Sequence, residues 1–399
     1  EHGAFLVRAW WSGYRDDPTI NPLPQLVNLL RITDRNGSSL NPFSANTYNV
    51  DVQHATNLGA SNRLLYGLNY RHNALSSSAI DQFSREDRLG MFIQDEWRAT
   101  STLTLVAGLR YDLHTQINGT WSPRVAILYQ PAEGHTFHVS GSVAYRPPTL
   151  YESHQDQRVT TSIPTGLPPP FPPVISSTVP VTGSTRLDPE QIISYEAGYQ
   201  GWFWKHRLRV RADAFFNHLS DLISSRAVPS GNSEFVNDQG SADIYGGEAG
   251  VEFLATRWLS GFANYAFEEI GQNFAGTVRR AAPRSKANAG LRGEWENGLS
   301  GEIVYYHVGA TTWPIAQTFT TLASIPTTGV SVPDSRVGSY NLLNLRAGYK
   351  FWQQRAAAGY MRDAEVAISV FNALNDKHKE HPLGDTIGSR VMGWLTVRF

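Results

Sequence analysis

Apolar and polar side chains alternate with a period of two along much of this chain. In "RLRVRADA" (residues 207–214) every even position is apolar and every odd position is charged. Residues 103–113, 344–351 and 365–372 alternate in a similar way. This period indicates β-strands with one face against lipid or a core and the other face against water.

The composition is compatible with a membrane protein that crosses the bilayer with strands. No window approaches the roughly 18 apolar residues of a spanning helix, and the mean hydropathy is -0.32. Transmembrane strands alternate apolar and polar residues, so their hydropathy averages out. Charged residues make up 17% of the 399, below the roughly 25% of soluble proteins.

Two further counts exclude classes of function. The formal net charge of -1 leaves no basic excess for nucleic-acid binding. Cysteine is absent, which excludes disulfides, zinc–thiolate sites and cysteine nucleophiles.

The spacing of the strands is more specific than their pattern. Tight turns at "NLGASN", "RATS", "PAEGH", "WKH", "ATRW" and "ENG" alternate with longer polar connections at 15–46, 76–87, 147–190, 227–241, 271–283, 312–339 and 375–389. An up-and-down barrel with hairpins on one rim and working loops on the other gives this alternation. We therefore predict an all-β fold, a transmembrane antiparallel up-and-down β-barrel of about 16 strands.

The sequences at the two ends of the chain have the alternating pattern of β-strands. The sequence finishes on "RVMGWLTVRF", with Val391, Leu395 and Val397 on one face and Phe399 last. We expect this strand to end at the periplasmic rim and to close against an earlier strand, leaving no unpaired edge. The start, "EHGAFLVRAWW", has no basic region or cleavage site of a signal peptide.

A soluble β-sandwich or propeller is the alternative fold. The chain has no repeat of 40–50 residues, which counts against a propeller. Tryptophans beside the short turns, such as Trp202, Trp258 and Trp295, suit the aromatic girdle of a membrane barrel better.

Several segments, in order, resemble the barrel of TonB-dependent outer-membrane receptors. These segments are "RLGMFIQDEWRATSTLTLVAGLRYD", "WSPRVAILYQP", "SGSVAYRPPTLYE", "LDPEQIISYEAGYQ", "ADAFFNHLSDLI", "YGGEAGVEF" and "VFNALND", followed by Arg390 and the terminal Phe399. Arg146, Pro147, Pro148 and Glu152 stand at the family's positions in the third segment. The terminal strand departs from the usual assembly signal, because Gly393 is one position away from the expected glycine.

The resemblance implies an organisation and partners for residues 1–399. Receptors of this family have about 22 strands and a plug domain in the lumen. We expect this chain to be the C-terminal part of such a barrel in a Gram-negative outer membrane, without the plug. The implied partners are outer-membrane lipid and lipopolysaccharide, the missing plug domain, the TonB complex reached only through that plug, and a small-molecule ligand. That ligand is a siderophore, haem, cobalamin, a nickel chelate or an oligosaccharide.

The long connections hold the candidate ligand contacts. "YESHQD" places Tyr151, Glu152 and His154 at the head of the longest one, and a solvated loop is the plainer interpretation. "NDKHKEHPLGD" offers His378 and His381 for a metal or metal-chelate contact, although a solvated polar loop is the better interpretation. Trp313 is a further candidate in the 312–339 connection, and we predict no metal site and no cofactor.

Two other segments allow more than one interpretation. "TVRRAAPRSK" carries Arg279, Arg280 and Arg284, which could attract an anionic ferric complex, bind lipopolysaccharide phosphates, or face acidic side chains of a plug. The proline-rich residues 164–180 are expected to form a stiff polyproline spacer rather than a docking strap.

Uptake of a scarce ligand, such as a ferric siderophore, is therefore the expected function. The alternative is a passive 16-stranded porin or a structural subunit of an envelope assembly. Catalytic motifs such as GxSxG, HExxH and the P-loop are absent, so we do not expect an enzyme.

Overall fold

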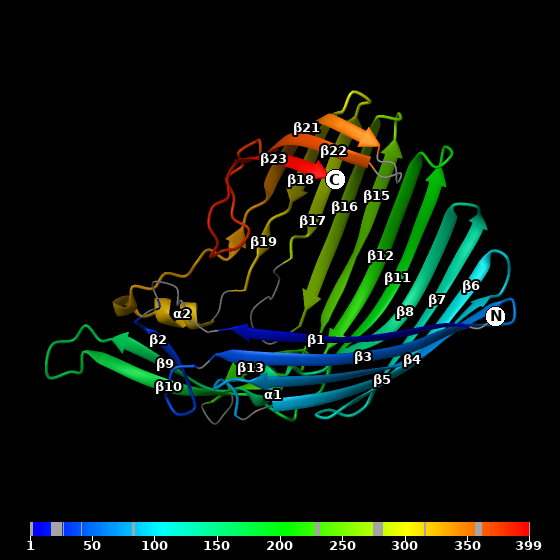
Figure 1. Cartoon of the computed structure of the whole chain (residues 1–399). Coiled ribbons are helices and arrows are strands. Elements are labelled where there is room, and N and C mark those ends of the chain that lie inside the picture. The colour runs from blue at the N-terminus through cyan, green and yellow to red at the C-terminus, as the bar shows by residue number, and fades with distance from the viewer. Residues whose placement is uncertain are drawn as a thin grey trace.

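The structure is a computed structural model that describes residues 3–16, 26, 28–40, 42–81, 84–227, 232–273, 282–314, 317–355 and 361–398. Within these residues, sixteen strands form one antiparallel sheet in which sequence neighbours pair (Figure 1). They are β1 (Ala4–Asp16), β3 (Phe43–Leu58), β4 (Asn62–Ser76), β5 (Ser84–Arg98), β6 (Leu103–His114), β7 (Thr120–Ala132), β8 (His135–Arg146), β11 (Glu190–Phe203), β12 (Leu208–Ser220), β15 (Ala242–Leu254), β16 (Leu259–Gln272), β17 (Ser285–Glu294), β18 (Leu299–Val308), β21 (Tyr340–Arg355), β22 (Met361–Phe371) and β23 (Arg390–Arg398). The predicted strand number is confirmed.

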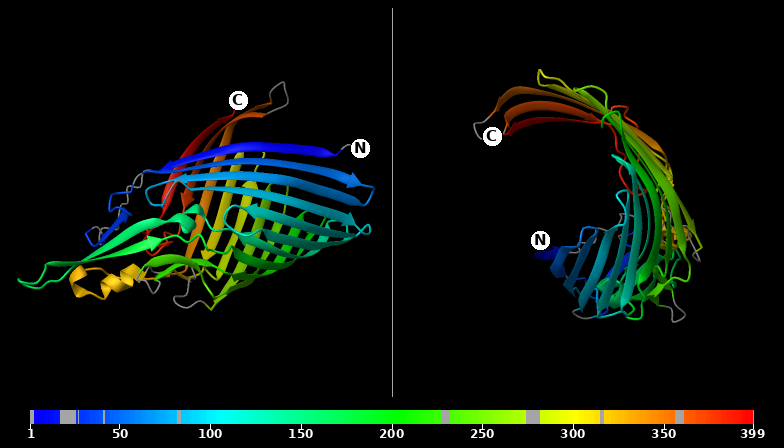
Figure 2. Two further views of the ribbon diagram at one scale, coloured as in Figure 1. Left: turned by 90° about the horizontal axis from the view of Figure 1, so that it is seen from below. Right: turned by 90° about the vertical axis from the view of Figure 1, so that its right-hand side faces the viewer.

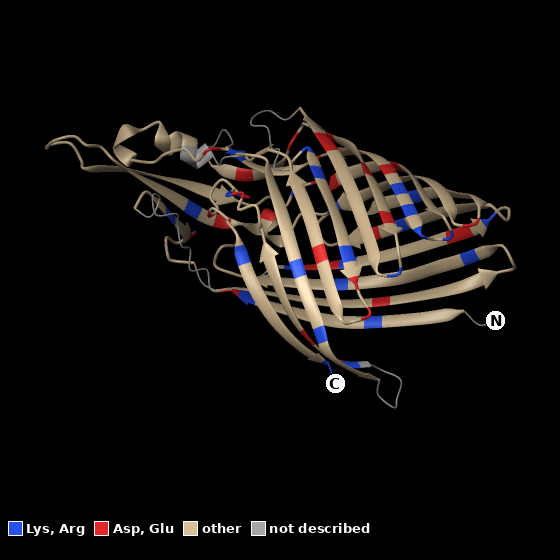
Figure 3. Cartoon of the chain, turned by 90° about the horizontal axis from the view of Figure 1, so that it is seen from above, with Lys and Arg blue, Asp and Glu red and all other residues tan. Residues whose placement is uncertain are grey.

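One face of this sheet is apolar and exposed. Val125, Val139 and Leu395 are 59%, 56% and 69% exposed. Their strand neighbours Arg124 and Ser140 belong to the opposite, polar face. Charged residues of both signs occur on many strands of the sheet (Figure 3). Exposure of the apolar side chains on the outer face is what lipid contact requires, and it is the reverse of a soluble sandwich.

The sheet is an open arc in the part of the chain that the structure describes. β1 pairs only with β3, and β23 pairs only with β22. The right-hand view of Figure 2 shows the two chain ends at the two tips of the arc. The expectation that the last strand leaves no unpaired edge is therefore wrong. A sheet of sixteen strands closes only if its curvature brings the last strand back to the first, and the curvature of this sheet does not (Figure 2).

The predicted alternation of connections is confirmed. Short turns join β3 to β4, β5 to β6, β7 to β8, β11 to β12, β15 to β16 and β17 to β18. The longer connections all lie at the opposite rim, because every strand reverses direction. Residues 115–119 between β6 and β7 are a short connection at this long-loop rim that we did not predict.

Three of the long connections build a second sheet. Its strands are, in order, β13 (Ile223–Ala227), β14 (Ser233–Asn237), β10 (Val174–Thr182), β9 (Asp156–Pro164) and β2 (Leu30–Asp34). β9 and β10 form a hairpin that projects from the rim (Figure 1). The polyproline spacer is therefore wrong for residues 174–180, because the β-branched "VISSTV" pairs with β9 instead.

The buried apolar clusters lie at the same long-loop rim. One comprises Leu26, Leu29, Leu322 and Val330, and the other comprises Leu75, Ile80 and Leu150. The long-loop rim is thus packed like a small soluble domain.

The helical segments are short: α1 (Leu150–His154), α2 (Gln317–Ala323) and the 3-10 turn η2 (Pro326–Thr328). None of the helices among the described residues is long and apolar enough to cross a membrane.

Candidate ligand site at the long-loop rim

Arg146 fastens the longest connection to the wall. Its guanidinium donates to both carboxylate oxygens of Glu190, with Nη2–Oε1 at 2.6 Å, and to Glu152, with Nη1–Oε2 at 3.0 Å. Glu190 also accepts the backbone N–H of Ile223. One arginine at the end of β8 therefore ties together α1, β11 and β13.

Glu152 completes this arrangement from the first turn of α1. Thr149 caps the helix, and its N–H donates to Glu152 Oε2 at 2.7 Å. Partial burial works against ionisation, but the hydrogen bonds from Arg146 and Thr149 prevail and lower the pKa of Glu152. The carboxylate is thus charged at neutral pH and engaged in positioning α1.

Tyr151 and His154 lie on the same short helix. Tyr151 Oη donates to Gln157 Oε1 at 3.2 Å, and burial raises the pKa of its phenol. His154 Nδ1 is 3.2 Å from Asp81 Oδ1, and its Nε2 is 3.2 Å from Gln116 Nε2. His154 therefore links three connections of the rim.

Trp313 and His381 come together from two other connections. Their rings meet edge to face with centroids 4.6 Å apart. The indole Nε1–H of Trp313 is buried and has no partner within the described residues. His378 is a more structural residue: its ring stacks on Tyr340 at 4.0 Å, and its Nδ1 is 2.7 Å from the Asp376 carbonyl oxygen.

The predicted arginine cluster is only partly described. Arg279 and Arg280 lie outside the described residues. Arg284 forms a two-point ion pair with Glu269 of β16, with Nε–Oε2 at 2.8 Å and Nη2–Oε1 at 2.9 Å. A neighbouring strand of the wall therefore already neutralises Arg284.

A second group of arginines went unnoticed in the sequence. Arg71, Arg88 and Arg110 lie on β4, β5 and β6 and line a cavity of about 230 Å³ together with His114 and Asp112. Arg71 and Arg88 stand directly opposite each other in the register. Like charges at such positions are unfavourable, so this pair favours an anion between them.

The partners of these arginines leave a positive balance. Arg110 forms a two-point pair with Asp112, and Arg88 pairs with Glu86 at 2.5 Å. Arg71 Nε donates to Asn49 Oδ1 at 3.3 Å and has no carboxylate in ion-pair range within the described chain. The three guanidiniums face two carboxylates, which makes the cavity attractive to anions.

The signal that could have revealed this group is the register. "NYRHN", "REDRLG" and "GLRYD" each place an arginine near the end of a strand at the long-loop rim. Without the pairing of residues across strands, nothing shows that they converge.

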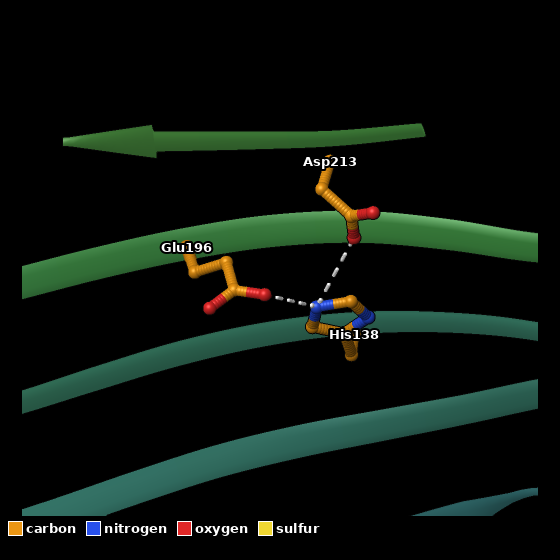
Figure 4. Close-up of side chains that lie close together, drawn as sticks. All are labelled: His138, Glu196 and Asp213. Atoms are coloured by element: carbon orange, nitrogen blue, oxygen red, sulfur yellow. Dashed lines mark hydrogen bonds and ion pairs between the residues drawn. The ribbon is translucent and has the colours of Figure 1, made fainter. Parts of the chain in front are cut away.

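Three side chains of metal-ligating type come together at one place among the described residues. His138, Glu196 and Asp213 offer ligand atoms that lie within 4.8 Å of one another (Figure 4). These residues belong to β8, β11 and β12.

Comparison with models of protein families identifies the family to which the chain belongs. The sequence model described as "TonB dependent receptor-like, beta-barrel" matches residues 5–373. The chain belongs to this family. TonB-dependent receptors are transporters and receptors rather than enzymes, and their barrels lie in the Gram-negative outer membrane, so the predicted location is confirmed.

Individual TonB-dependent receptors resemble the chain over different lengths. A probable TonB-dependent siderophore receptor, PirA of Acinetobacter baumannii, is 27% identical over 150 residues, which are 36% of this chain and 19% of that protein. A mutant of the ferric enterobactin receptor PfeA of Pseudomonas aeruginosa superposes with a TM-score of 0.72 at 13% identity, over 98% of this chain and 59% of that one. The siderophore receptor PirA of Pseudomonas aeruginosa gives a TM-score of 0.65 at 16% identity, over 90% and 58%.

These structural matches establish the barrel fold. The chain spans less than two thirds of the length of the solved receptors, and less than a fifth of the curated relative.

Proposed function

We propose that the chain is the barrel portion of an outer-membrane receptor that takes up a ferric siderophore. Family membership supports this function, and so do the siderophore receptors among the similar proteins. Capture of the ligand occurs at the long-loop rim, and the TonB complex drives import through a plug domain.

The arginine-lined cavity carries the proposal. Ferric complexes of catecholate or hydroxycarboxylate siderophores are anionic, and guanidiniums bind such oxygens with charge-assisted hydrogen bonds. Arg71, Arg88 and Arg110 provide these donors on the polar face near the rim. Because Arg71 lacks a carboxylate partner within the described residues, it is the arginine that a ligand engages most readily.

The loops add an outer contact surface. α1 presents Tyr151 and His154, and the Trp313–His381 pair presents aromatic rings from two other connections. Aromatic faces suit the flat rings of a catecholate. Glu152 serves this surface by holding α1 in place.

The polar face and the sheet edges point to further partners. In a bilayer every backbone amide needs a partner, so β1 and β23 require additional strands along their free edges. We assign residues 1–399 to one part of such a barrel and the charged polar face to contact with a plug. Lipid and lipopolysaccharide cover the apolar face.

A passive porin is the competing function. A self-contained porin needs a closed ring, and in the described residues the ends of this sheet are unpaired. A planar-bilayer recording separates the two: the receptor shows almost no conductance, whereas a porin shows steady open channels.

The test measures binding of an iron-55 tris-catecholate complex to native outer membranes. Arg71→Gln and Arg88→Gln are each expected to weaken binding about ten- to hundredfold, because each removes a charge-assisted hydrogen bond. Arg284→Gln is the matched control, since Arg284 is already paired with Glu269. Equal affinity in Arg71→Gln and Arg284→Gln would overturn the assignment of the cavity.

Expression supplies an independent check. A siderophore receptor is induced when iron is withheld from the growth medium. Constant expression in iron-rich and iron-poor medium would remove the siderophore and leave the other ligand classes.

A further inference from the structure

Three strands place one imidazole between two carboxylates on the polar face. His138 Nε2 lies 3.1 Å from Glu196 Oε1 and 3.7 Å from Asp213 Oδ1 (Figure 4). His138 and Asp213 share a row of the sheet, because both are registered against Gly198 of β11. Glu196 is two residues from Gly198 and therefore lies on the same face.

Gly198 makes this approach possible. A Cβ at Gly198 would lie 2.0 Å from Asp213 Oδ1 and 2.3 Å from His138 Cε1. Its backbone does not have the positive φ that would itself require glycine. The missing side chain instead leaves the space in which the imidazole and the carboxylate meet.

The charges of the group are unbalanced. Glu196 and Asp213 have oxygens within 4.8 Å of each other, and two carboxylates at such a distance repel. Within the described residues no arginine or lysine is in ion-pair range of either one. Arg211, two residues from Asp213, instead approaches Glu252 at 3.8 Å and Asn264 at 3.2 Å.

The distances suit a small divalent metal ion. Zn²⁺ bonds to nitrogen and oxygen of about 2.0–2.2 Å place tetrahedral ligand atoms about 3.3–3.6 Å apart. The two spacings from His138 Nε2, 3.1 and 3.7 Å, bracket this range, and the oxygens of Glu196 and Asp213 lie within 4.8 Å of each other. One imidazole with two carboxylates is a donor set that Zn²⁺ accepts, with a fourth position left for water.

Other histidine–carboxylate contacts of the chain show how this group differs. His72 with Asp87, at 2.8 Å, and His218 with Asp243, at 2.7 Å, are pairs with a single carboxylate. Only His138, among the described histidines, is within ion-pair range of two carboxylates.

We propose that His138, Glu196 and Asp213 form a Zn²⁺ site on the polar face of the barrel wall. The site lies toward the short-turn rim, because His138 is three residues from the start of β8. It is therefore separate from the arginine-lined cavity at the opposite rim, and it does not depend on the siderophore function. Side-chain exposures of 30%, 50% and 32% leave the three residues accessible from the polar face.

Zinc binding to the purified, detergent-solubilised protein tests the site. Isothermal titration with Zn²⁺ alone, in competition with a chromophoric chelator, is expected to give one tight site per chain. His138→Gln and Asp213→Asn are each expected to weaken that site at least about tenfold, because loss of a ligand exceeds the effect of losing an outer-shell partner. Binding of Co²⁺ to the same site should give the visible absorption of a tetrahedral ion.

Matched controls separate this site from the other histidines. His218→Gln removes a histidine that contacts a single carboxylate, and His381→Gln removes one from the last described loop; neither is expected to change Zn²⁺ affinity. Gly198→Ala keeps all three ligands, yet it should weaken binding because its methyl group occupies the space between them.

The Zn²⁺ affinities of the variants either support the proposed site or overturn it. Unchanged Zn²⁺ affinity in His138→Gln and Glu196→Gln, both folded by heat-modifiable gel mobility, would overturn the site, as would the absence of a tight site in the unaltered protein. Should His138→Gln fail to fold, Glu196→Gln decides the question, because it keeps the shape and volume of the side chain.

Discussion

The wall of the barrel and the long-loop rim are held together by different forces. The wall is one sheet thick, and its apolar side chains point outward, as the exposure of Val125 and Val139 shows. The rim has buried clusters around Leu322 and Leu150 and a sheet of its own. We therefore expect lipid to stabilise the wall from outside, whereas buried contacts within the rim stabilise the rim.

Because different forces stabilise the wall and the rim, the stability of each can be changed without affecting the other. A substitution in the rim should loosen loops and leave the wall intact. A substitution on the apolar face of the wall should act only in the presence of a bilayer or detergent.

The largest effect is expected in the packed cluster of the rim. Leu322 is 1% exposed, and Leu322→Ala removes a buried side chain at a cost of about 2–5 kcal/mol. Hydrogen exchange should rise across residues 317–337, while the heat-modifiable gel mobility of the barrel stays unchanged. Val332→Ala is the control, because Val332 lies in the same connection and is 45% exposed. An unfolded barrel in Leu322→Ala would contradict the separation of the two regions.

A charge on the lipid face tests the wall. Val139→Arg is expected to lower the free energy of unfolding by about 1–3 kcal/mol, because it places a guanidinium in lipid between the short-turn rim and the midplane. Ser140→Arg, on the adjacent polar face, should have little effect. The measurement is the urea midpoint of protein folded in lipid vesicles, and equal midpoints for the two variants would invalidate the assignment of faces.

The ion pairs of Arg146 with Glu152 and Glu190, which we call the Arg146 clamp, join the wall to the rim. Their loss should show an intermediate effect. Arg146→Gln leaves Glu152 and Glu190 close together without their cation, at an expected cost of about 1–2 kcal/mol after allowance for the exposure of the guanidinium. Faster hydrogen exchange in α1 and β13 would report the loss. Arg158→Gln is a control in the same connection, and the clamp assignment fails if both variants behave alike.

The same clamp predicts a dependence on pH. The pKa of Glu152 is lowered in the folded state, so its stabilising contribution is complete above its ordinary value of 4.5 and is lost as the pH falls below that value. Exchange of α1 amides, corrected for intrinsic rates, should therefore accelerate below about pH 4.5. Glu152→Gln should abolish this acceleration, and a persistent acceleration would assign it to another group.

The smallest effect belongs to the exposed ion pair of Arg284 and Glu269. Arg284 is 62% exposed, and such pairs contribute about 0–1 kcal/mol. Arg284→Gln should leave the urea midpoint in vesicles within error of the unaltered protein. A large decrease would mean that the rim depends on surface charge more than on its apolar clusters.

The difference between the wall and the rim also determines which features of the structure could be predicted from the sequence. Strand β6 follows directly from the alternation in residues 103–113, because the pattern that places side chains in lipid is local. The short turns are equally local, so the number and order of the strands follow. Closure could not be predicted in this way, since curvature depends on the whole sheet rather than on any segment.

The rim and the sites depend on contacts between distant residues. β9 pairs with β2, more than a hundred residues earlier in the chain, and no periodicity in residues 156–164 reveals that partner. In the sequence His138 lies near His135 but far from Glu196 and Asp213. Only the register that brings Gly198 beside it, with Asp213 in the next strand, makes it part of a group.

The free edges of β1 and β23 have a consequence for biogenesis. Each amide on such an edge that reaches hydrocarbon without a partner costs several kcal/mol, so the arc cannot rest in the membrane as a stable intermediate. Pairing of each edge with further strands and passage of the arc into the bilayer must therefore be coupled to each other.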